Sequence, residues 1–236
     1  MSSTRTERIT VDDGAFDLHL WVPDTGRGPG IVLIQEIFGV GSYIRAVGDR
    51  LATMGYVVGA PDMFWREHRN WQADHTEAGM AAAMELARKV EPQKAVGDCL
   101  ASLAAVDGLD EVGPGRPGII GFCFGGTMAW ATAIHDDPSV AVSYYGSQVP
   151  SMLDQLDQIR CPVLLHFGEE DAFLPIEGVR AVEAAVADRA DIEIHVHPGA
   201  GHAFDNHEAP MFHQPEAAAT AWNQTTAFLN RHLPVS

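Results

Sequence analysis

Apolar residues recur along the chain in short runs separated by longer stretches of helical spacing. The six short runs have the length of buried parallel strands: Gly30–Gln35, Tyr56–Ala60, Gly118–Phe122, Val140–Tyr145, Pro162–Phe167 and Asp191–Val196. Alanine, leucine and methionine repeat with helical periodicity in the segments between or after them: Ser42–Met54, His75–Lys89, Gln93–Leu109, Phe124–Ile134, Ile176–Ala187 and Pro215–His232. Alternating strands and helices predict an α/β fold in which helices cover a mostly parallel sheet.

The chain opens with a different pattern, which is typical of a β-hairpin. Glu7–Val11 and Phe16–Val22 have strand-like alternation, and Asp12, Asp13 and Gly14 between them are turn residues. The hairpin brings the predicted sheet to eight strands with helices on both faces. Because no linker-like segment interrupts the alternation, residues 1–236 are expected to form a single domain.

The composition narrows the classes of partner. Fifteen Lys and Arg against 32 Asp and Glu give a formal net charge of -17, and no basic run occurs, so neither nucleic acid nor an anionic membrane surface is an expected partner. With 46% hydrophobic residues, the chain is expected to be globular and soluble. No apolar stretch approaches the ~18 residues of a membrane span, and Met1–Thr10 does not resemble a signal peptide, so the cytoplasm is the expected location.

The cysteines indicate no disulfide framework. Cys99, Cys123 and Cys161 are odd in number and form no CxxC pair, which also argues against a cysteine zinc site. Cys99 lies inside a predicted helix and Cys161 precedes Pro162 at a strand start, as expected of thiols that only pack.

Cys123 stands in a different context, between the strand Gly118–Phe122 and a helix. The pentapeptide Gly121-Phe122-Cys123-Phe124-Gly125 matches the nucleophile elbow of hydrolases with Cys in place of Ser, and both glycines that the crowded turn needs are present. Chance would supply only about 0.03 such pentapeptides in a chain of this composition. The alternative is a small buried cysteine in a tight turn.

A cysteine nucleophile needs a base and a group that orients the base. In α/β folds with a nucleophile elbow, the orienting acid follows the nucleophile along the chain, and the histidine base follows the acid. Asp171 follows the strand Pro162–Phe167, and His202 follows the strand Asp191–Val196. The carboxyl ends of parallel strands form the edge where ligands bind, so these loops are expected to converge. Asp171 is preferred to Glu169 and Glu170 because an apolar segment follows it.

The remaining histidines do not suggest a metal site. His195 and His197 share one face of the last strand and are expected at surface or edge positions. No His-Glu-x-x-His motif is present, and no carboxylate stands at helical spacing from a histidine.

Parts of the sequence also fit two other function classes. Gly39-Val40-Gly41 between a strand and a helix, with Asp62 after the next strand, fits a nucleotide-binding module, but Ile44 occupies its third glycine position. The second class is a non-catalytic or redox-sensing relative of such hydrolases, with Cys123 as a regulatory thiol.

The elbow and the loops that carry Asp171 and His202 resemble those of the dienelactone hydrolase family of the α/β-hydrolase fold, in which the elbow carries Cys. The likeness covers nearly the whole chain. It rests on Gln35-Glu36-Ile37-Phe38-Gly39, Ala60-Pro61-Asp62, Gly121-Phe122-Cys123-Phe124-Gly125-Gly126, Gly168-Glu169-Glu170-Asp171 and Gly201-His202-Ala203-Phe204.

The resemblance implies a role for each matching residue. Cys123 would be the nucleophile, His202 the base and Asp171 its orienting acid. Glu36 would be an additional carboxylate that contacts the resting thiol; the alternative is an anion near the start of the helix at Ser42. Backbone amides of Ile37 and Phe124 would form the oxyanion hole.

One departure concerns the substrate. The resemblance implies two arginines that hold the carboxylate of dienelactone, but the matching stretches, Gly79–Ala83 and Asp205–His207, contain none. Arg66 and Arg69 lie in an aromatic-rich loop that could supply cations or could simply pack its aromatic residues. Together with Tyr145 and Phe173, they are the candidate substrate-binding residues.

The sequence therefore predicts a cysteine-dependent hydrolase of a small ester or lactone that acts through an acyl-thioester. No cofactor and no metal are implied, and the sequence leaves the oligomeric state open.

Overall fold

A computed structural model of the protein describes residues 3–235. Its backbone groups into two compact units. The first contains the chain up to Ile119 together with Val235, and the second contains Ile120–Pro234. The expectation that the whole chain is one domain stays a prediction, and the two units are described in turn.

The predicted fold class is confirmed. Eight strands form a sheet with the order β1-β2-β4-β3-β5-β6-β7-β8. The sheet is mixed: the first hairpin and its pairing with β4 are antiparallel, whereas β3 with β4, β6 with β7 and β7 with β8 are parallel.

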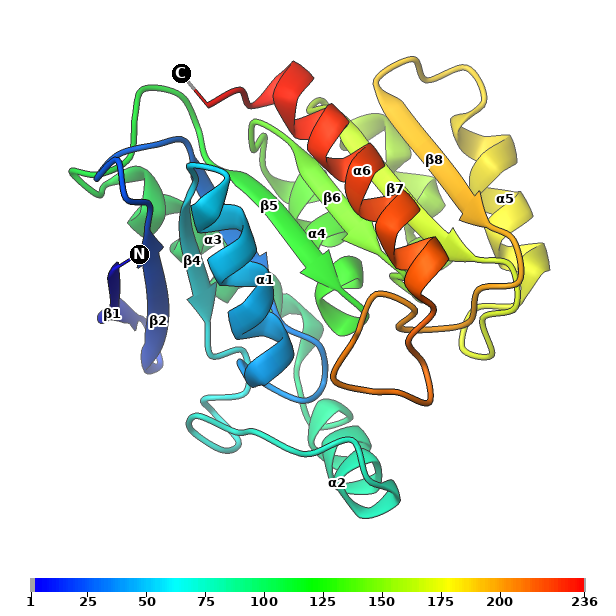
Figure 1. The fold of residues 1–236 in the computed structure, drawn as a ribbon, viewed down its shortest axis with the longest axis horizontal. Coiled ribbons are helices and arrows are strands. Elements are labelled where there is room, and N and C mark those ends of the chain that lie inside the picture. Colours follow the sequence, from blue (N-terminus) through cyan, green and yellow to red (C-terminus); the bar gives the residue numbers. More distant parts are fainter. Residues whose placement is uncertain (1–2, 236) are drawn as a thin grey trace. The chain divides into compact units, whose positions relative to one another are not determined.

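The first unit contains the strands β1 (Ser3–Val11), β2 (Gly14–Val22), β3 (Gly30–Ile34) and β4 (Val57–Pro61), with the helices α1 (Ser42–Thr53), α2 (Glu77–Ala87) and α3 (Pro92–Asp107). Every residue of β3 and β4 is buried, as expected of parallel strands covered on both faces. Figure 1 shows how this occurs, because α1 lies in front of these strands and α3 lies behind them.

The second unit contains α4 (Phe124–His135), β6 (Ala141–Tyr144), a 3₁₀ helix η1 (Val149–Gln158), β7 (Val163–Gly168), α5 (Ile176–Val186), β8 (Ile192–His197) and α6 (Pro215–His232). The strand β5 (Gly118–Phe122) passes from the first unit into the second. In Figure 1, α6 lies in front of the sheet, where it contacts β7 and β8, and α4 packs against β6 from behind.

One strand and one helix differ most from the sequence expectation. The strand β1 begins at Ser3 rather than Glu7, because Thr4, Arg5 and Thr6 continue the antiparallel pairing with β2 although they are polar and exposed. The 3₁₀ helix η1 was not predicted, since such helices are short connecting elements and the segment between Tyr145 and Pro162 was not assigned to a helix.

Within residues 3–235, no helix is both long enough and apolar enough to cross a bilayer.

Candidate active site

Cys123 occupies the sharp turn between β5 and α4. Its backbone has φ 56° and ψ -113°, a left-handed conformation that residues with a side chain rarely adopt. The turn excludes a side chain at Gly121, where a Cβ would lie 1.9 Å from the carbonyl oxygen of Gly125. The Cys123 amide donates to the carbonyl of Tyr144 at the end of β6 over 3.0 Å. The turn therefore has the shape expected of a nucleophile elbow and is fixed to the neighbouring strand.

Three side chains predicted to act together lie in one hydrogen-bonded row within the second unit. The Sγ atom of Cys123 is 3.0 Å from Nε2 of His202, and Nδ1 of His202 is 2.7 Å from Oδ2 of Asp171. The loops after β7 and β8 supply Asp171 and His202, and so converge as the sheet topology predicted. The row has the atoms and the order that a nucleophile, base and orienting acid require.

Asp171 is held in place by the backbone that follows it. Its Oδ1 accepts from the amides of Phe173 and Leu174, at 2.7 and 3.2 Å, which leaves Oδ2 for His202. Its side chain is fully buried, whereas Glu169 and Glu170 are exposed. Asp171 is thus the acid of this loop that can orient an imidazole.

The His202 imidazole is mostly buried, and its environment favours the protonated form. Burial by itself lowers the pKa, but the negative charge of Cys123 and the hydrogen bonds to Asp171 and Cys123 outweigh it and raise the pKa of His202 to about 10. At neutral pH this imidazole therefore tends to hold a proton.

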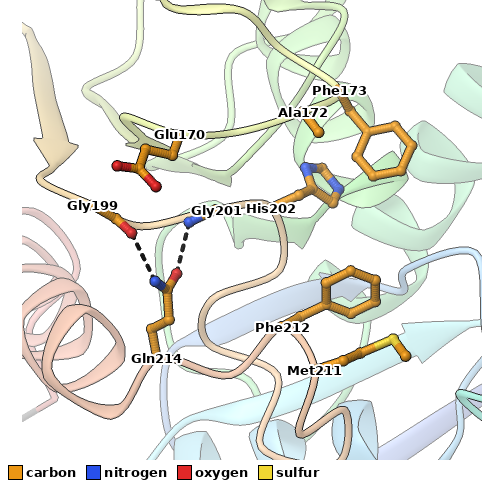
Figure 2. A pocket seen from close by; sticks show the side chains of 9 residues that line it. All are labelled: Glu170, Ala172, Phe173, Gly199, Gly201, His202, Met211, Phe212 and Gln214. Carbon is orange, nitrogen blue, oxygen red and sulfur yellow. Dashed lines mark hydrogen bonds between the residues drawn. The ribbon is translucent and has the colours of Figure 1, made fainter.

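A residue that the sequence did not single out secures the loop that carries His202. Oε1 of Gln214 accepts from the amide of Gly201 over 2.6 Å, and its Nε2 donates to the carbonyl of Gly199 over 2.7 Å, as Figure 2 shows. The Gln214 amide also donates to the carbonyl of Phe204. Residue 214 is therefore bonded to the chain on both sides of His202.

A cavity of about 290 Å³ opens beside the His202 ring. It is lined by residues of the loop after β7 and of the long loop between β8 and α6: Glu170, Ala172, Phe173, Gly199, Gly201, His202, Met211, Phe212 and Gln214. Two predicted substrate-binding residues lie against the same imidazole, since the ring centroids of Phe173 and Tyr145 are 4.8 and 5.1 Å from that of His202. Figure 2 shows the phenyl ring of Phe173 next to this imidazole.

Glu36 and Ile37 belong to the first unit, in the segment after β3. Both are buried, with exposed fractions of 2% and 8%. Gln35, which is fully buried, fixes the segment: its Nε2 donates to the Glu36 carbonyl and its Oε1 accepts from the Met63 amide, both over 3.1 Å. The roles of Glu36, Ile37 and the Phe124 amide stay predictions.

Arg66 and Arg69 also belong to the first unit, where both contact Trp65. Arg66 binds two carboxylates, with Nε 2.7 Å from Oδ2 of Asp13 and Nη2 3.1 Å from Oδ1 of the buried Asp98, and its guanidinium lies 4.3 Å from the Trp65 ring centroid. Arg69 donates to the carbonyl of Ala15. Binding a substrate carboxylate would require Arg66 to leave strong partners, and the substrate-binding role of both arginines stays a prediction.

His166 and His197 form a buried histidine pair apart from the row of Cys123, His202 and Asp171. The position of His197 corrects the expectation that it lies at the surface or edge. His197 is buried rather than at a surface position, and its Nε2 is 3.1 Å from Nδ1 of the fully buried His166. Nε2 of His166 is 3.0 Å from Oγ1 of Thr225, which is 2.6 Å from the hydroxyl of Tyr144. The helix α6 covers the edge of the sheet, which is why a polar residue of the last strand is buried there.

Among residues 3–235, no group of three or more His, Cys, Asp and Glu side chains is placed to hold a metal ion.

Comparison with known proteins points to one family. The model of the Dienelactone hydrolase family matches residues 16–233. A carboxymethylenebutenolidase of Pseudomonas sp. (strain P51) is 31% identical over 98% of this chain and 97% of its own, and one of Rhodococcus opacus is 34% identical over 90% and 84%. The structure of a dienelactone hydrolase-like promiscuous phosphotriesterase from metagenomic libraries superposes with a TM-score of 0.81 at 22% identity, covering 98% of this chain and 99% of its own, which shows a common fold.

Proposed function

Since the chain belongs to the dienelactone hydrolase family, we propose that it is a cysteine-dependent hydrolase of a small, uncharged ester or lactone. The observation that carries the proposal is the row Cys123, His202, Asp171, with contacts of 3.0 and 2.7 Å, at a strained elbow. A redox-sensing thiol is the weaker alternative, because such a role needs neither a histidine nor an orienting carboxylate next to the sulfur.

In the first step, the sulfur of Cys123 attacks the carbonyl carbon of the substrate. A C–S bond forms and the carbonyl electrons move to oxygen, giving a tetrahedral oxyanion. The raised pKa of His202 favours this step, because the imidazole takes the thiol proton and leaves the sulfur as the more nucleophilic thiolate. Asp171 holds the ring in the orientation that keeps Nε2 on the sulfur.

The oxyanion needs two hydrogen-bond donors. We assign them to the backbone amides of Phe124, directly after the nucleophile, and of Ile37, in the segment that Gln35 fixes. An amide after the elbow residue is a standard donor of this architecture, and a rigid second loop costs no reorganisation during the reaction.

The oxyanion then collapses and expels the alkoxide, which takes the proton from His202. The alcohol leaves, or the lactone ring opens, and the acyl group remains on sulfur as a thioester. A water molecule next attacks the thioester and gives its proton to the now neutral imidazole. The C–S bond breaks, which releases the acid and restores the thiolate and the imidazolium.

The preference for an uncharged substrate rests on the cations of the chain. Positions 79–83 and 205–207 contain no arginine, Arg66 is bound to Asp13 and Asp98, and the net charge is -17. A charged substrate carboxylate would therefore meet an unfavourable field. A small-molecule substrate and a cytoplasmic location remain part of this proposal.

The decisive experiment compares the three cysteines. Cys123→Ala should lower kcat for acetate esters by at least about 10³-fold, because the covalent pathway is lost. Cys99→Ala and Cys161→Ala are the matched controls and should keep most of the activity, since both thiols are buried and burial raises the pKa of Cys161 to about 12. Intact-protein mass spectrometry should show the trapped acetyl group on residue 123. Full activity of Cys123→Ala would refute the assignment.

A further inference from the structure

The cavity beside His202 has an apolar rim that solvent reaches. Phe173 is 48% exposed and Met211 is 69% exposed, and both line the cavity. Within residues 3–235, the remaining exposed large hydrophobic residue is Val235, which lies elsewhere. Exposed apolar side chains gathered at one hollow generally mark a binding surface, because a ligand that covers them removes apolar area from water.

The polar end of the cavity offers little to an anion. Its two glycine amides are already used: Gly201 donates to Gln214, and Gly199 donates to Oε2 of Glu169. The nine lining residues include no Lys or Arg, and the positive charge of the protonated His202 is offset by Asp171 and Cys123, which lie 2.7 and 3.0 Å from its ring nitrogens. Glu170 adds a negative charge. Figure 2 shows the Glu170 carboxylate on the glycine side and the two phenyl rings and Met211 on the other. The chemistry of the lining therefore selects an uncharged apolar group.

The position of the cavity indicates which part of an ester it would take. His202 forms part of its wall, and Cys123 is not among the lining residues. In the mechanism proposed above, His202 gives its proton to the departing oxygen, so the alcohol portion of the substrate leaves from the histidine side, whereas the acyl portion remains on the sulfur. A volume of about 290 Å³ is ample for an aryl or short alkyl group, since roughly 150 Å³ accommodates benzene.

We propose that this cavity is the leaving-group subsite of the enzyme, which binds the uncharged apolar alcohol portion of the ester or lactone through Phe173, Met211 and Phe212 and disfavours anionic alcohols through Glu170. The inference rests on the proposed function. It goes further by stating that the alcohol portion of the substrate determines which esters are preferred.

The test uses two ester series on the full-length protein. In the first series, the acyl group is always acetyl and the alcohol changes from methyl to butyl to benzyl. In the second, the alcohol is always methyl and the acyl group changes from acetyl to pentanoyl to phenylacetyl. The proposal predicts that kcat/KM rises by about 10-fold or more with alcohol size. Every ester of the acetyl series gives the same acetyl-enzyme. When hydrolysis of this intermediate limits turnover, kcat should therefore vary little along the series.

Met211→Ala should then lower kcat/KM for benzyl acetate by about 10-fold and for methyl acetate by less than about 2-fold, because only the larger alcohol reaches the side chain. Met211→Leu should restore most of the loss. Val235→Ala is the matched control, since it also removes an exposed hydrophobic side chain but one that does not line the cavity.

A second comparison tests the charge. Glu170→Gln should raise the ratio of kcat/KM for 4-(acetoxymethyl)benzoate, the carboxylated analogue of benzyl acetate, to kcat/KM for benzyl acetate by about 2- to 5-fold at low salt. Glu183→Gln, which removes an exposed carboxylate on α5, should leave this ratio unchanged.

The outcomes separate the two proposals. Hydrolysis of methyl acetate together with equal effects of Met211→Ala on small and large alcohols would overturn the subsite and leave the hydrolase intact. Selectivity that follows acyl size instead would overturn it in the same way. No hydrolysis of any ester in either series would refute the proposed function, and the subsite with it.

Discussion

The groups that face the two ring nitrogens of His202 determine whether the proton between Cys123 and His202 lies on the imidazole. Nε2 of the imidazole faces the sulfur and Nδ1 faces Asp171, and together these partners raise the pKa of His202 to about 10 in spite of its burial. A carboxylate near the sulfur would act in the opposite direction, because a negative charge disfavours a thiolate. We propose this restraining role for Glu36, whose side chain is 2% exposed.

Glu36→Gln tests this opposition. If the Glu36 charge restrains the thiolate, the variant should be alkylated by iodoacetamide several-fold faster at pH 7, because the sulfur loses an unfavourable neighbour. Ester turnover should fall if the carboxylate also takes the thiol proton during the reaction. The rate of alkylation and kcat are measured on the same preparation. Wild-type values for both would assign Glu36 a purely structural role.

At the scale of elements, the site depends on how α6 is joined to the loop after β8. Gln214 is the residue before the first turn of α6, and its side chain bonds Gly199 and Gly201 while its amide bonds Phe204. The start of a helix thereby fixes the position of His202, which lies between those residues. We expect Gln214 to be a positioning residue that acts through His202.

Gln214→Ala should lower kcat by about 10- to 100-fold with a smaller change in KM, because a misplaced imidazole transfers protons poorly while the substrate contacts remain. The pH at which Cys123 becomes reactive to iodoacetamide should also shift, a readout that a loss of stability alone would not move. Gln224→Ala is the control, since Gln224 lies on the same helix and bonds His195. Unchanged kcat with a lower melting temperature would contradict the positioning role.

Helices and strands with strong periodicity could be predicted from the sequence. Hydrogen bonds between side chains and distant loop backbone could not. The bounds of β5 and of α6 agree with the expectation, because Gly118–Phe122 is uniformly apolar and Pro215–His232 has a proline start and helical spacing. Gln35 and Gln214 were missed because their hydrogen-bond partners lie 28 and 13 residues away, where no local pattern signals them. The proximity of Asp171 and His202 could be predicted because the strand order of the architecture places their loops together.

At the scale of the molecule, the buried histidines link stability to pH. Burial, reinforced by the charges of His197 and His195, holds the pKa of His166 well below its usual value, and burial followed by the charge of His195 lowers the pKa of His197 to about 4. The unfolded chain binds protons at these positions near pH 6.5. Between about pH 6.5 and 4 the unfolded state therefore binds more protons than the folded state, and the free energy of unfolding falls as the pH falls.

Melting temperatures from pH 7.5 to 4.5 should decrease, and His197→Gln should flatten the decrease, because each such histidine contributes up to about 1.4 kcal/mol per pH unit in this window. Glutamine at position 197 keeps a hydrogen-bonding group near Nδ1 of His166 and cannot be protonated. The groups that face the pair, His195, Thr225, Tyr144 and Phe204, stay in place. The exposed His207 provides the control variant His207→Gln. An equal slope in His197→Gln would exclude the cluster as the cause.

The backbone of Cys123 has a further consequence for the whole molecule. A residue with a side chain at φ 56° and ψ -113° is less stable there than glycine would be, by on the order of 1–3 kcal/mol. Stability alone would favour glycine at position 123, and glycine has no sulfur to attack a carbonyl. Under the proposed mechanism, selection for activity and selection for thermal tolerance therefore act in opposite directions at position 123, and an inactive descendant of the chain is free to gain stability by a change at a residue that the chemistry requires.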